Sequence, residues 1–348
     1  FNLLCAAGGA HVSHHGANEP TVAVVKVPDP RLERLAALIF KPKKVTYATM
    51  EFVDFVAMTR GVGKGEGLGS HYVAQMRQVD ALLHVLRDFE DPGIAHTEGK
   101  IDAARDAVLV NTELLLADLD ILEKRITRLE SDLKKMKKDE AVRELELLKR
   151  CHAWLAEEKP IRELALAEED QKALRGFALL TAKPMLFLLN ISEKKLGKPH
   201  PTLERLQRAF GGKGVATIQL CAKTEYEVAQ LPPEDAEEFR KDLGLHAGGF
   251  AEVLRACFQL LDLVTFYTGE GGEETRAWTI PAGSTVLKAA GTVHSDLERG
   301  FIRAEVVNFA DLEAAGSLAA ARKRGILRVE GREYRIADGD VIAVRFNV

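Results

Sequence analysis

A long heptad pattern of apolar residues constrains the fold of this chain more than any other feature of its sequence. Residues 101–175 contain no glycine, and leucine, lysine and glutamate dominate there. Within this stretch, apolar residues recur at alternating steps of four and three positions: Leu115, Leu119, Leu122, Ile126, Leu129, Leu133 and Met136. This spacing draws one apolar seam along a helix, and such a seam must pack against a second helix. The sequence therefore predicts an antiparallel helical hairpin of coiled-coil type over residues 101–176.

A returning helix follows the heptad helix. Its apolar residues are Val142, Leu145, Leu148, Trp154 and Leu155. Between the two helices lies a cluster of four lysines, which we place at the far end of the hairpin: Lys134, Lys135, Lys137 and Lys138. Two interpretations stay open. The hairpin is either an arm that binds a partner, with lysines that meet RNA phosphates, or a packed helical subdomain whose lysines are only solvated.

The sequence on both sides of the hairpin alternates strands with helices, which is typical of an α/β domain with a parallel sheet. The predicted strands are residues 21–27, the strand that ends at Asp54, and residues 81–86, 185–190 and 214–221. The predicted helices are an opening helix in FNLLCAAGG and residues 31–40, 69–77 and 201–210. Because the alternation resumes after the hairpin, the hairpin is predicted to be an insertion within one α/β domain.

From Leu263 the pattern changes to short strands separated by turns. The predicted strands lie in VTFYT, TRAWTI, GFIRAEVV, YRI and IAVRFNV. We expect a compact, mostly β module with one or two short helices. The predicted domains are therefore a discontinuous nucleotide-binding domain (1–100 and 177–262), the helical insertion (101–176) and the C-terminal module (263–348).

Composition and charge argue against several classes of protein. No apolar run approaches the roughly 18 residues of a membrane-spanning helix, so no membrane partner is expected. A net charge of -4 gives no general attraction to nucleic acid, so contact with RNA requires a local basic patch. The four cysteines lie far apart without a CxxC pair. That spacing argues against a zinc site or a disulfide framework and fits a reducing cytoplasm.

Asp54 is the first candidate site residue. Its carboxylate is predicted at the C-terminal tip of a strand, the edge where open α/β sheets place their ligands. An aspartate there can hold Mg²⁺ on a polyphosphate, although a helix cap or a loop aspartate is the alternative. The glycine-rich loop at residues 61–69 follows, but it matches neither the dinucleotide nor the GxxxxGK[ST] spacing. We interpret it as a switch-like loop whose glycines permit rearrangement.

Two further candidates follow the strands at 185–190 and 214–221. The amide of Asn190 both donates and accepts, and the Glu193 carboxylate can accept from N–H groups of a nucleobase. The segment Cys221-Ala222-Lys223 is predicted to be a loop of small residues, whose backbone N–H groups could approach a ring. Taken singly, the segment from Asn190 to Glu193 is more often a turn with a helix cap, and the segment from Cys221 to Lys223 is more simply the end of a strand. Their order along the chain, after the acidic strand end and the glycine loop, is typical of a P-loop nucleotide-binding domain.

The N-terminal segment lacks two features that such a domain normally has. A nucleotide-binding sheet begins with a strand and a phosphate loop, and neither lies after Phe1, so we expect the phosphate loop upstream of it. The histidines His11, His14 and His15 could bind a transition metal. With no fourth ligand in view, a solvated loop is the favoured interpretation.

Many segments of the chain match one known family in that family's order: FNLL, VPDPRLERL, MEFVDF, GKGEGLGSHYVAQMRQVDALLHVLRDFED, NTELLLADLD, LLNISEK, CAKTEYEVAQL, TFYTG, EETRAWTI, VHSDLERGFIRAEVV and DGDVIAVRFNV. On these segments the chain resembles the YchF or Obg-like ATPases. The resemblance implies a Ras-like P-loop domain with an inserted coiled-coil hairpin and a C-terminal TGS domain of β-grasp type. It also implies a monomer that associates with the ribosome, at the large subunit or the intersubunit region, and with RNA.

The resemblance implies ATP rather than GTP as the nucleotide, because Asn-x-x-Glu replaces the guanine reader Asn-Lys-x-Asp. These positions are Asn190 and Glu193 here, and Ile191 is expected to line the adenine pocket, with Cys221 and Ala222 beside the nucleotide. Slow hydrolysis of ATP with Mg²⁺ is implied as well, with Asp54 as the metal residue.

Three departures from the family pattern accompany the resemblance. The family's phosphate loop would lie immediately before Phe1. The family's DxxG reads Asp54-Phe55-Val56-Ala57, so Ala57 stands where a glycine N–H contacts the γ-phosphate. The first switch loop is altered, with Asn18 near the place of the metal-contacting threonine, and no metal ligand is assigned there. The alternative hypothesis is therefore a nucleotide-independent scaffold that binds ribosomes or RNA through a degenerate nucleotide domain.

Overall fold

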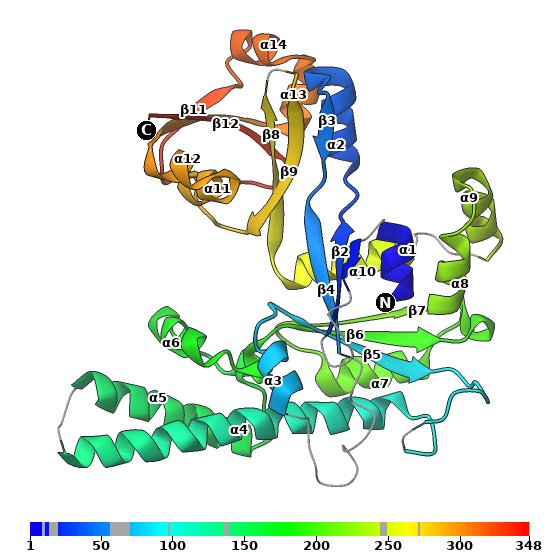
Figure 1. The fold of residues 1–348 in the computed structure, drawn as a ribbon, viewed down its shortest axis with the longest axis vertical. Helices are drawn as coiled ribbons and strands as arrows, with labels where there is room; N and C mark the ends of the chain where they lie inside the picture. The colour runs from blue at the N-terminus through cyan, green and yellow to red at the C-terminus, as the bar shows by residue number, and fades with distance from the viewer. Residues whose placement is uncertain are drawn as a thin grey trace. The chain divides into compact units, whose positions relative to one another are not determined.

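The computed structural model describes residues 1–8, 11–13, 20–55, 70–96, 98–135, 139–243, 249–270 and 272–347. These residues form two compact units (Figure 1). The first unit joins residues 1–53 to residues 261–348, and the second consists of residues 54–260. Each unit has its own sheets and its own apolar core.

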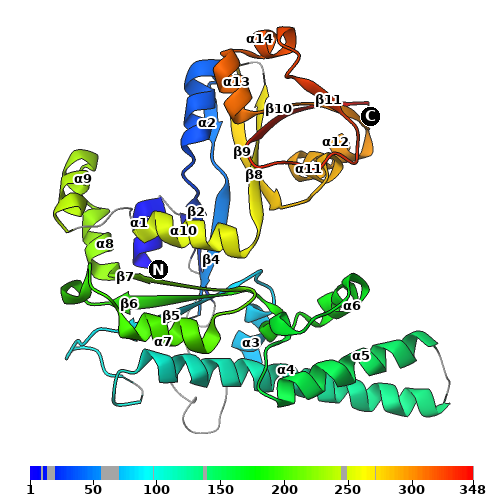
Figure 2. The same cartoon turned by 180° about the vertical axis from the view of Figure 1, so that it is seen from behind.

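The second unit is built on a three-stranded parallel sheet in the order β5-β6-β7. Its strands are β5 (Leu82–Asp88), β6 (Met185–Ile191) and β7 (Val215–Leu220). The central strand β6 is buried along almost its whole length, as expected for a strand covered on both faces. Helices α7 (Pro201–Phe210) and α4 (Ala103–Lys135) lie on one face and α10 (Gly249–Leu260) on the other, as Figures 1 and 2 both show. The predicted parallel arrangement is confirmed for these three strands.

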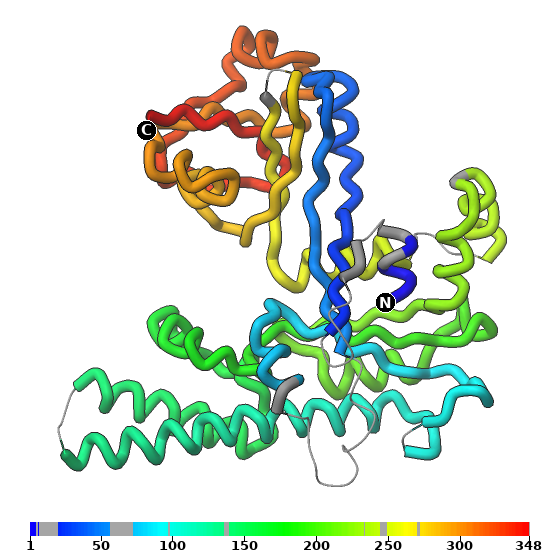
Figure 3. The backbone as a smooth tube through the Cα atoms, in the orientation of Figure 1, coloured from blue at the N-terminus to red at the C-terminus, as the bar shows by residue number. Residues whose placement is uncertain are grey.

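The predicted helical hairpin is confirmed. Helix α4 runs out and α5 (Asp139–Ala156) returns beside it, a path that Figure 3 traces. The heptad residues from Leu115 to Ile126 and Leu129 face a shared apolar core with Leu148, Cys151, Trp154 and Leu155 of α5. The prediction for Val142 was wrong, because its side chain is exposed and Leu147 takes a buried place instead. Met136, Lys137 and Lys138 lie outside the described residues.

A buried ion pair fixes the hairpin to the rest of its unit. The Asp118 side chain of α4 is fully buried and accepts from the Arg77 guanidinium at 2.8 Å. Its two oxygens also accept from the backbone N–H of Leu180 at 3.0 Å and from both the N–H and the hydroxyl of Thr181 at 2.8 Å. A buried carboxylate with four hydrogen bonds is well satisfied, so Asp118 joins α4 to the turn that precedes β6.

The remaining helices of the second unit are short. They are α3 (Ser70–Met76), η2 (Ile161–Glu163), α6 (Glu168–Leu174), η3 (Arg175–Phe177), η4 (Leu180–Ala182), η5 (Glu193–Lys195), α8 (Ala222–Val228) and α9 (Pro233–Asp242). The prediction of a loop at Cys221-Ala222-Lys223 was wrong. Cys221 is the N-cap of α8, whose helix begins at once after β7.

The first unit contains a six-stranded sheet in the order β11-β10-β12-β8-β9-β3. Its strands are β11 (Arg328–Glu330), β10 (Phe301–Asn308), β12 (Asp340–Phe346), β8 (Leu263–Glu270), β9 (Glu274–Pro281) and β3 (Lys44–Thr46). Helix α11 (Val286–Val293) and its neighbour α12 (Ser295–Arg299) pack on one face. The other face packs against α2 (Pro30–Arg34), the π-helical turn η1 (Leu35–Phe40), α13 (Phe309–Ala315) and α14 (Leu318–Lys323).

The prediction of one parallel sheet was wrong for the two N-terminal strands. Strands β2 (Thr21–Lys26) and β4 (Thr49–Asp54) lie in a separate sheet of order β1-β2-β4, with β1 (His11–Ser13) antiparallel to β2, after the opening helix α1 (Asn2–Gly8). The chain between β2 and β4 packs within the first unit. Its helix buries Leu32 and Leu35 against Tyr267 of β8, and the Tyr267 hydroxyl donates to Asp29 at 2.5 Å.

Two predictions for the C-terminal module were also wrong. The module has four short helices rather than one or two. Helices α11 and α12 lie in the connection after β9, and α13 and α14 lie in the connection after β10. The segment Tyr334-Arg335-Ile336 forms one isolated bridge, from Arg335 to Thr285, instead of a strand. Its partner segment turns directly into α11, so only one bridge can form.

Candidate functional site

The carboxyl ends of the three parallel strands bring the predicted base-reading segments to one edge of the sheet. Asp88 pairs with Ile191 at the end of β5 and β6, and Asn190 pairs with Leu220 at the end of β7. The segments that follow these strands therefore begin beside each other. In open parallel sheets this edge is where ligands bind.

Asn190 and Ala222 are in direct contact. The Asn190 side-chain oxygen accepts from the Ala222 N–H at 3.0 Å. This bond fixes the plane of the amide and leaves its NH₂ group as a donor. Cys221, the residue between β7 and that N–H, is buried, and its sulfur accepts from the Thr224 hydroxyl at 3.2 Å. The structure thus joins two of the segments that the sequence singled out separately.

The other two predicted base contacts differ in exposure. Ile191 is the last residue of β6, and its side chain is buried within the core of the sheet. Glu193 is exposed at the first position of the turn η5. Its carboxylate therefore lies in solvent at the edge that carries Asn190, where a ligand can reach it.

A charged cluster at this edge was missed by the sequence analysis. Lys195 donates to the Asp88 carboxylate at 2.9 Å and to the Asp88 backbone oxygen at 3.1 Å. His200, the N-cap residue of α7, places Nε2 2.9 Å from the same carboxylate oxygen, and its side chain is 6% exposed. The available signal was an aspartate at the end of a strand followed, after the next strand, by two basic residues.

Asp54 is the last residue of β4 and is half-buried, so the prediction of an acidic strand end is confirmed. Ala57, the glycine loop at 61–69, Asn18, His14 and His15 lie outside the described residues. Among the residues that the structure does describe, no three His, Cys, Asp or Glu side chains gather as a metal site would require.

Comparisons with known proteins place the chain in a family. The family model YchF-GTPase_C, described as a protein of unknown function (DUF933), matches residues 263–347. The "Ribosome-binding ATPase YchF" of Bacillus subtilis is 41% identical over 351 residues, covering 100% of this chain and 95% of that protein. The chain belongs to the YchF family. A second member, the "Ribosome-binding ATPase YchF" of Escherichia coli O157:H7, is 40% identical over 330 residues, with 95% of this chain and 90% of that protein covered.

Solved structures agree with this membership of the YchF family. The Schizosaccharomyces pombe YchF GTPase superposes with a TM-score of 0.85 at 26% identity, over 99% of this chain and 93% of that one. A GTP-binding protein from Pyrococcus horikoshii OT3 gives a TM-score of 0.62 at 20% identity, which bears on the fold alone. The Ras-like domain with a helical insertion and a C-terminal β module is thus the fold of this YchF family member. In the described ranges, no helix combines the length and apolar character that crossing a membrane needs.

The side chains of this site fit an adenine nucleotide with Mg²⁺ in chemical type. The NH₂ group of Asn190 offers a donor, and the exposed Glu193 carboxylate offers an acceptor for the exocyclic amine of adenine. Asp54 offers the hard carboxylate oxygen that Mg²⁺ prefers. Asp54 and Asn190 lie at the carboxyl ends of β4 and β6, and Glu193 follows two residues after β6, so each backbone is held by or beside a strand.

Proposed function

We propose that this chain is a ribosome-associated ATP-binding protein with slow, Mg²⁺-dependent ATPase activity. The observation that carries the proposal is the bond from the Ala222 N–H to the Asn190 oxygen, which assembles a base-reading edge beside the exposed Glu193. Membership of the YchF family supports it, since the relatives named above are called ribosome-binding ATPases.

The preference for adenine rests on Glu193. A carboxylate accepts a hydrogen bond from the exocyclic amine of adenine, and the Asn190 amide can donate to a ring nitrogen. In this proposal Ile191 lines the pocket from the end of β6, while Cys221 and Ala222 close it from the start of α8. The tight approach of α8 to Asn190 keeps the amide oriented before the nucleotide arrives, which lowers the entropic cost of binding.

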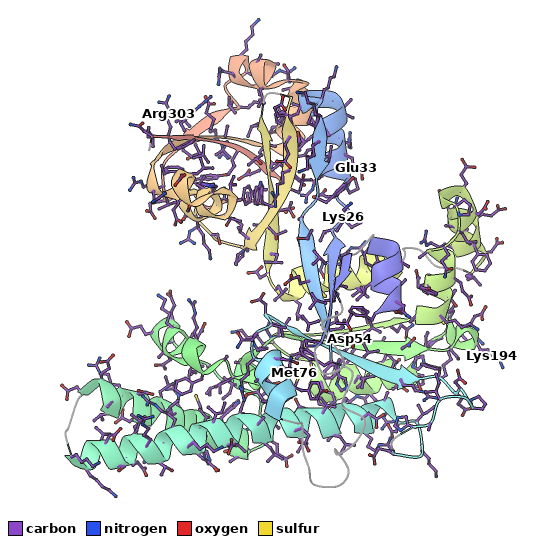
Figure 4. All side chains as sticks on the ribbon, in the orientation of Figure 1. Lys26, Glu33, Asp54, Met76, Lys194 and Arg303 are labelled. Atoms are coloured by element: carbon purple, nitrogen blue, oxygen red, sulfur yellow. The ribbon has the colours of Figure 1, made fainter. Side chains whose placement is uncertain are left out.

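The metal role falls to Asp54. Its position at the tip of β4 is marked in Figure 4. When bound, Mg²⁺ would supply positive charge to the phosphate groups. Asp54 would hold that ion directly or through a water, and the Ala57 N–H is proposed as a donor to the γ-phosphate.

The ribosome is the proposed partner, and the chain would contact its RNA. The hairpin carries Lys134 and Lys135 at the end of α4, where both are exposed. Exposed lysines at a helix end suit contact with backbone phosphates. We propose the division into residues 1–100 with 177–262, residues 101–176 and residues 263–348, with the last as the TGS-like module.

Calorimetric titration of the full natural protein with Mg²⁺ and ATP tests the proposal. We expect binding, and Asn190→Ala should weaken it by about 1–3 kcal/mol, the cost of leaving a buried partner unsatisfied. The matched control is Gln207→Ala, an exposed amide on α7 of the same unit. Glu193→Asp should lower the preference for ATP over GTP.

The two competing functions give different results. Ribosome co-sedimentation without any ATP binding would favour the nucleotide-independent scaffold. Equal affinity of the wild type and Asn190→Ala for ATP would remove Asn190 from the base-reading role, and tighter binding of GTP than of ATP would reject the adenine assignment.

A further inference from the structure

One carboxylate at the sheet edge holds two residues of the segment that follows β6 and contains Glu193. Lys195 reaches Asp88 with its ammonium group at 2.9 Å, and His200 reaches the same oxygen with Nε2 at 2.9 Å. Asp88 is the last residue of β5, and its side chain is 14% exposed. The segment between Ser192 and α7 is thereby tied to a neighbouring strand at two points.

We propose that Asp88, Lys195 and His200 are positioning residues that set the adenine preference by fixing the backbone of Glu193. This inference rests on the proposed function, since the three residues would position the side chain that reads the base. None of the three touches the base in this proposal, and Glu193 remains the contact.

The geometry of η5 makes the tie effective. Glu193 and Lys195 share one tight turn, closed by the Lys195 N–H to Ser192 at 2.9 Å and by the Leu196 N–H to Glu193 at 3.1 Å. The Lys195 ammonium additionally donates to the Asp88 backbone oxygen at 3.1 Å, so it holds the strand as well as the side chain. A shift of Lys195 must therefore move the Glu193 backbone with it.

The far end of the segment is held more deeply. His200 caps α7 and is 6% exposed, whereas the Lys195 side chain is 43% exposed. Within the described part of the chain the buried Nδ1 of His200 has no hydrogen-bond partner, so Asp88 is the polar group that orients this ring. Because His200 is held in place, the contact between Lys195 and Asp88 determines the position of the Glu193 backbone.

Base preference is the property that this arrangement controls. ATP and GTP share their ribose and phosphates, so groups that contact those parts affect both affinities equally. The Glu193 carboxylate meets the base, and hydrogen bonds weaken steeply when distance or angle departs from the optimum. Loss of the anchor should therefore change the ratio of the two affinities rather than their common level.

The test compares ATP and GTP affinities of the full natural protein by calorimetry, with Mg²⁺ present. In Lys195→Met we expect the ATP-to-GTP affinity ratio to fall about 5- to 10-fold, the scale of one ordinary hydrogen bond, because the Glu193 contact is weakened rather than removed. Lys195→Arg keeps a cation that can reach Asp88 and should retain the wild-type ratio. Lys194→Met is the matched control, because that neighbouring side chain, labelled in Figure 4, is exposed in the same turn.

Asp88→Asn provides a second variant of nearly the same shape, and its ratio should fall as in Lys195→Met. An unchanged ratio in both variants, or an equal loss of both affinities, would overturn the positioning role and leave a purely structural contact. If the wild-type protein binds ATP but shows no preference over GTP, this inference fails while ATP binding stands. If the wild type binds neither nucleotide, the proposed function fails as well.

Discussion

Replacing Asp118 by alanine should destabilise the unit of residues 54–260 by about 3–5 kcal/mol, the usual cost of removing one partner of a buried ion pair. The magnitude follows from what the carboxylate holds. Arg77 is only 10% exposed and would keep its charge without its counter-ion. The N–H groups of Leu180 and Thr181 would also lose their acceptor in a buried place. The remaining bonds from Arg77 to the Ala117 and Ala178 carbonyls offset only part of this loss.

Urea unfolding followed by tryptophan fluorescence measures this effect in the right unit. The chain has two tryptophans. Trp154 belongs to the hairpin core, so a Trp278→Phe background makes the signal report on the hairpin alone. The control is Asp120→Ala, whose carboxylate is 58% exposed and pairs with Lys124 one turn away. It should cost less than about 0.5 kcal/mol. A loss for Asp118→Ala no larger than that of the control would refute the reasoning.

Three further predictions follow from other parts of the chain. Changing Lys134, Lys135, Lys137 and Lys138 together to glutamine should weaken ribosome co-sedimentation and flatten its salt dependence; an unchanged salt slope would make these lysines a solvated helix end. Burial lowers the pKa of His84 to about 4, so the unfolded chain takes up a proton near pH 6.5 while the folded protein does not. The free energy of unfolding should therefore fall as the pH drops from 6.5 to 4. Urea titrations at several pH values should show that His84→Leu loses roughly 1–3 kcal/mol less than the wild type over this range. Equal pH profiles of the two proteins would exclude this histidine as the cause. Gly269→Ala should destabilise the first unit by about 1–3 kcal/mol, because a Cβ there would lie 2.7 Å from the Phe40 ring. Adding Phe40→Leu should restore part of this stability. A thermal melt in which Gly269→Ala leaves the melting temperature unchanged would contradict the close contact with Phe40.

Local patterns predicted the elements that depend on local periodicity. The heptad spacing gave the hairpin, because a seam such as Leu115 to Leu129 can be buried only against another helix. Asn190 and Ala222 could be anticipated as neighbours, since each follows a buried strand and parallel strands end at one edge. The prediction that Val142 belongs to the apolar face of the returning helix was wrong because this apolar residue lies outside the buried face of α5. Leu147 is buried instead.

Long-range pairings could not be predicted in this way. Strand β3 has only three residues, and nothing in them indicates that they join β9 in the C-terminal sheet. Lys195 and His200 look like solvated loop residues, and only the fold shows that Asp88 lies between them. The roles of Asp54, Ile191, Glu193 and Cys221 as ligand contacts stay predictions.

The pairing of β3 with β9 has a consequence for synthesis on the ribosome. Thr46 meets Glu274, which is added to the nascent chain 228 residues later. At about 5–20 residues per second, the N-terminal segment waits on the order of 10–50 s for its partner strand. The unit of residues 54–260 is continuous in sequence, so it can fold during that interval. The unit in the middle of the sequence can therefore fold first, and β3, although it is made early, pairs with β9 only after that unit has been made.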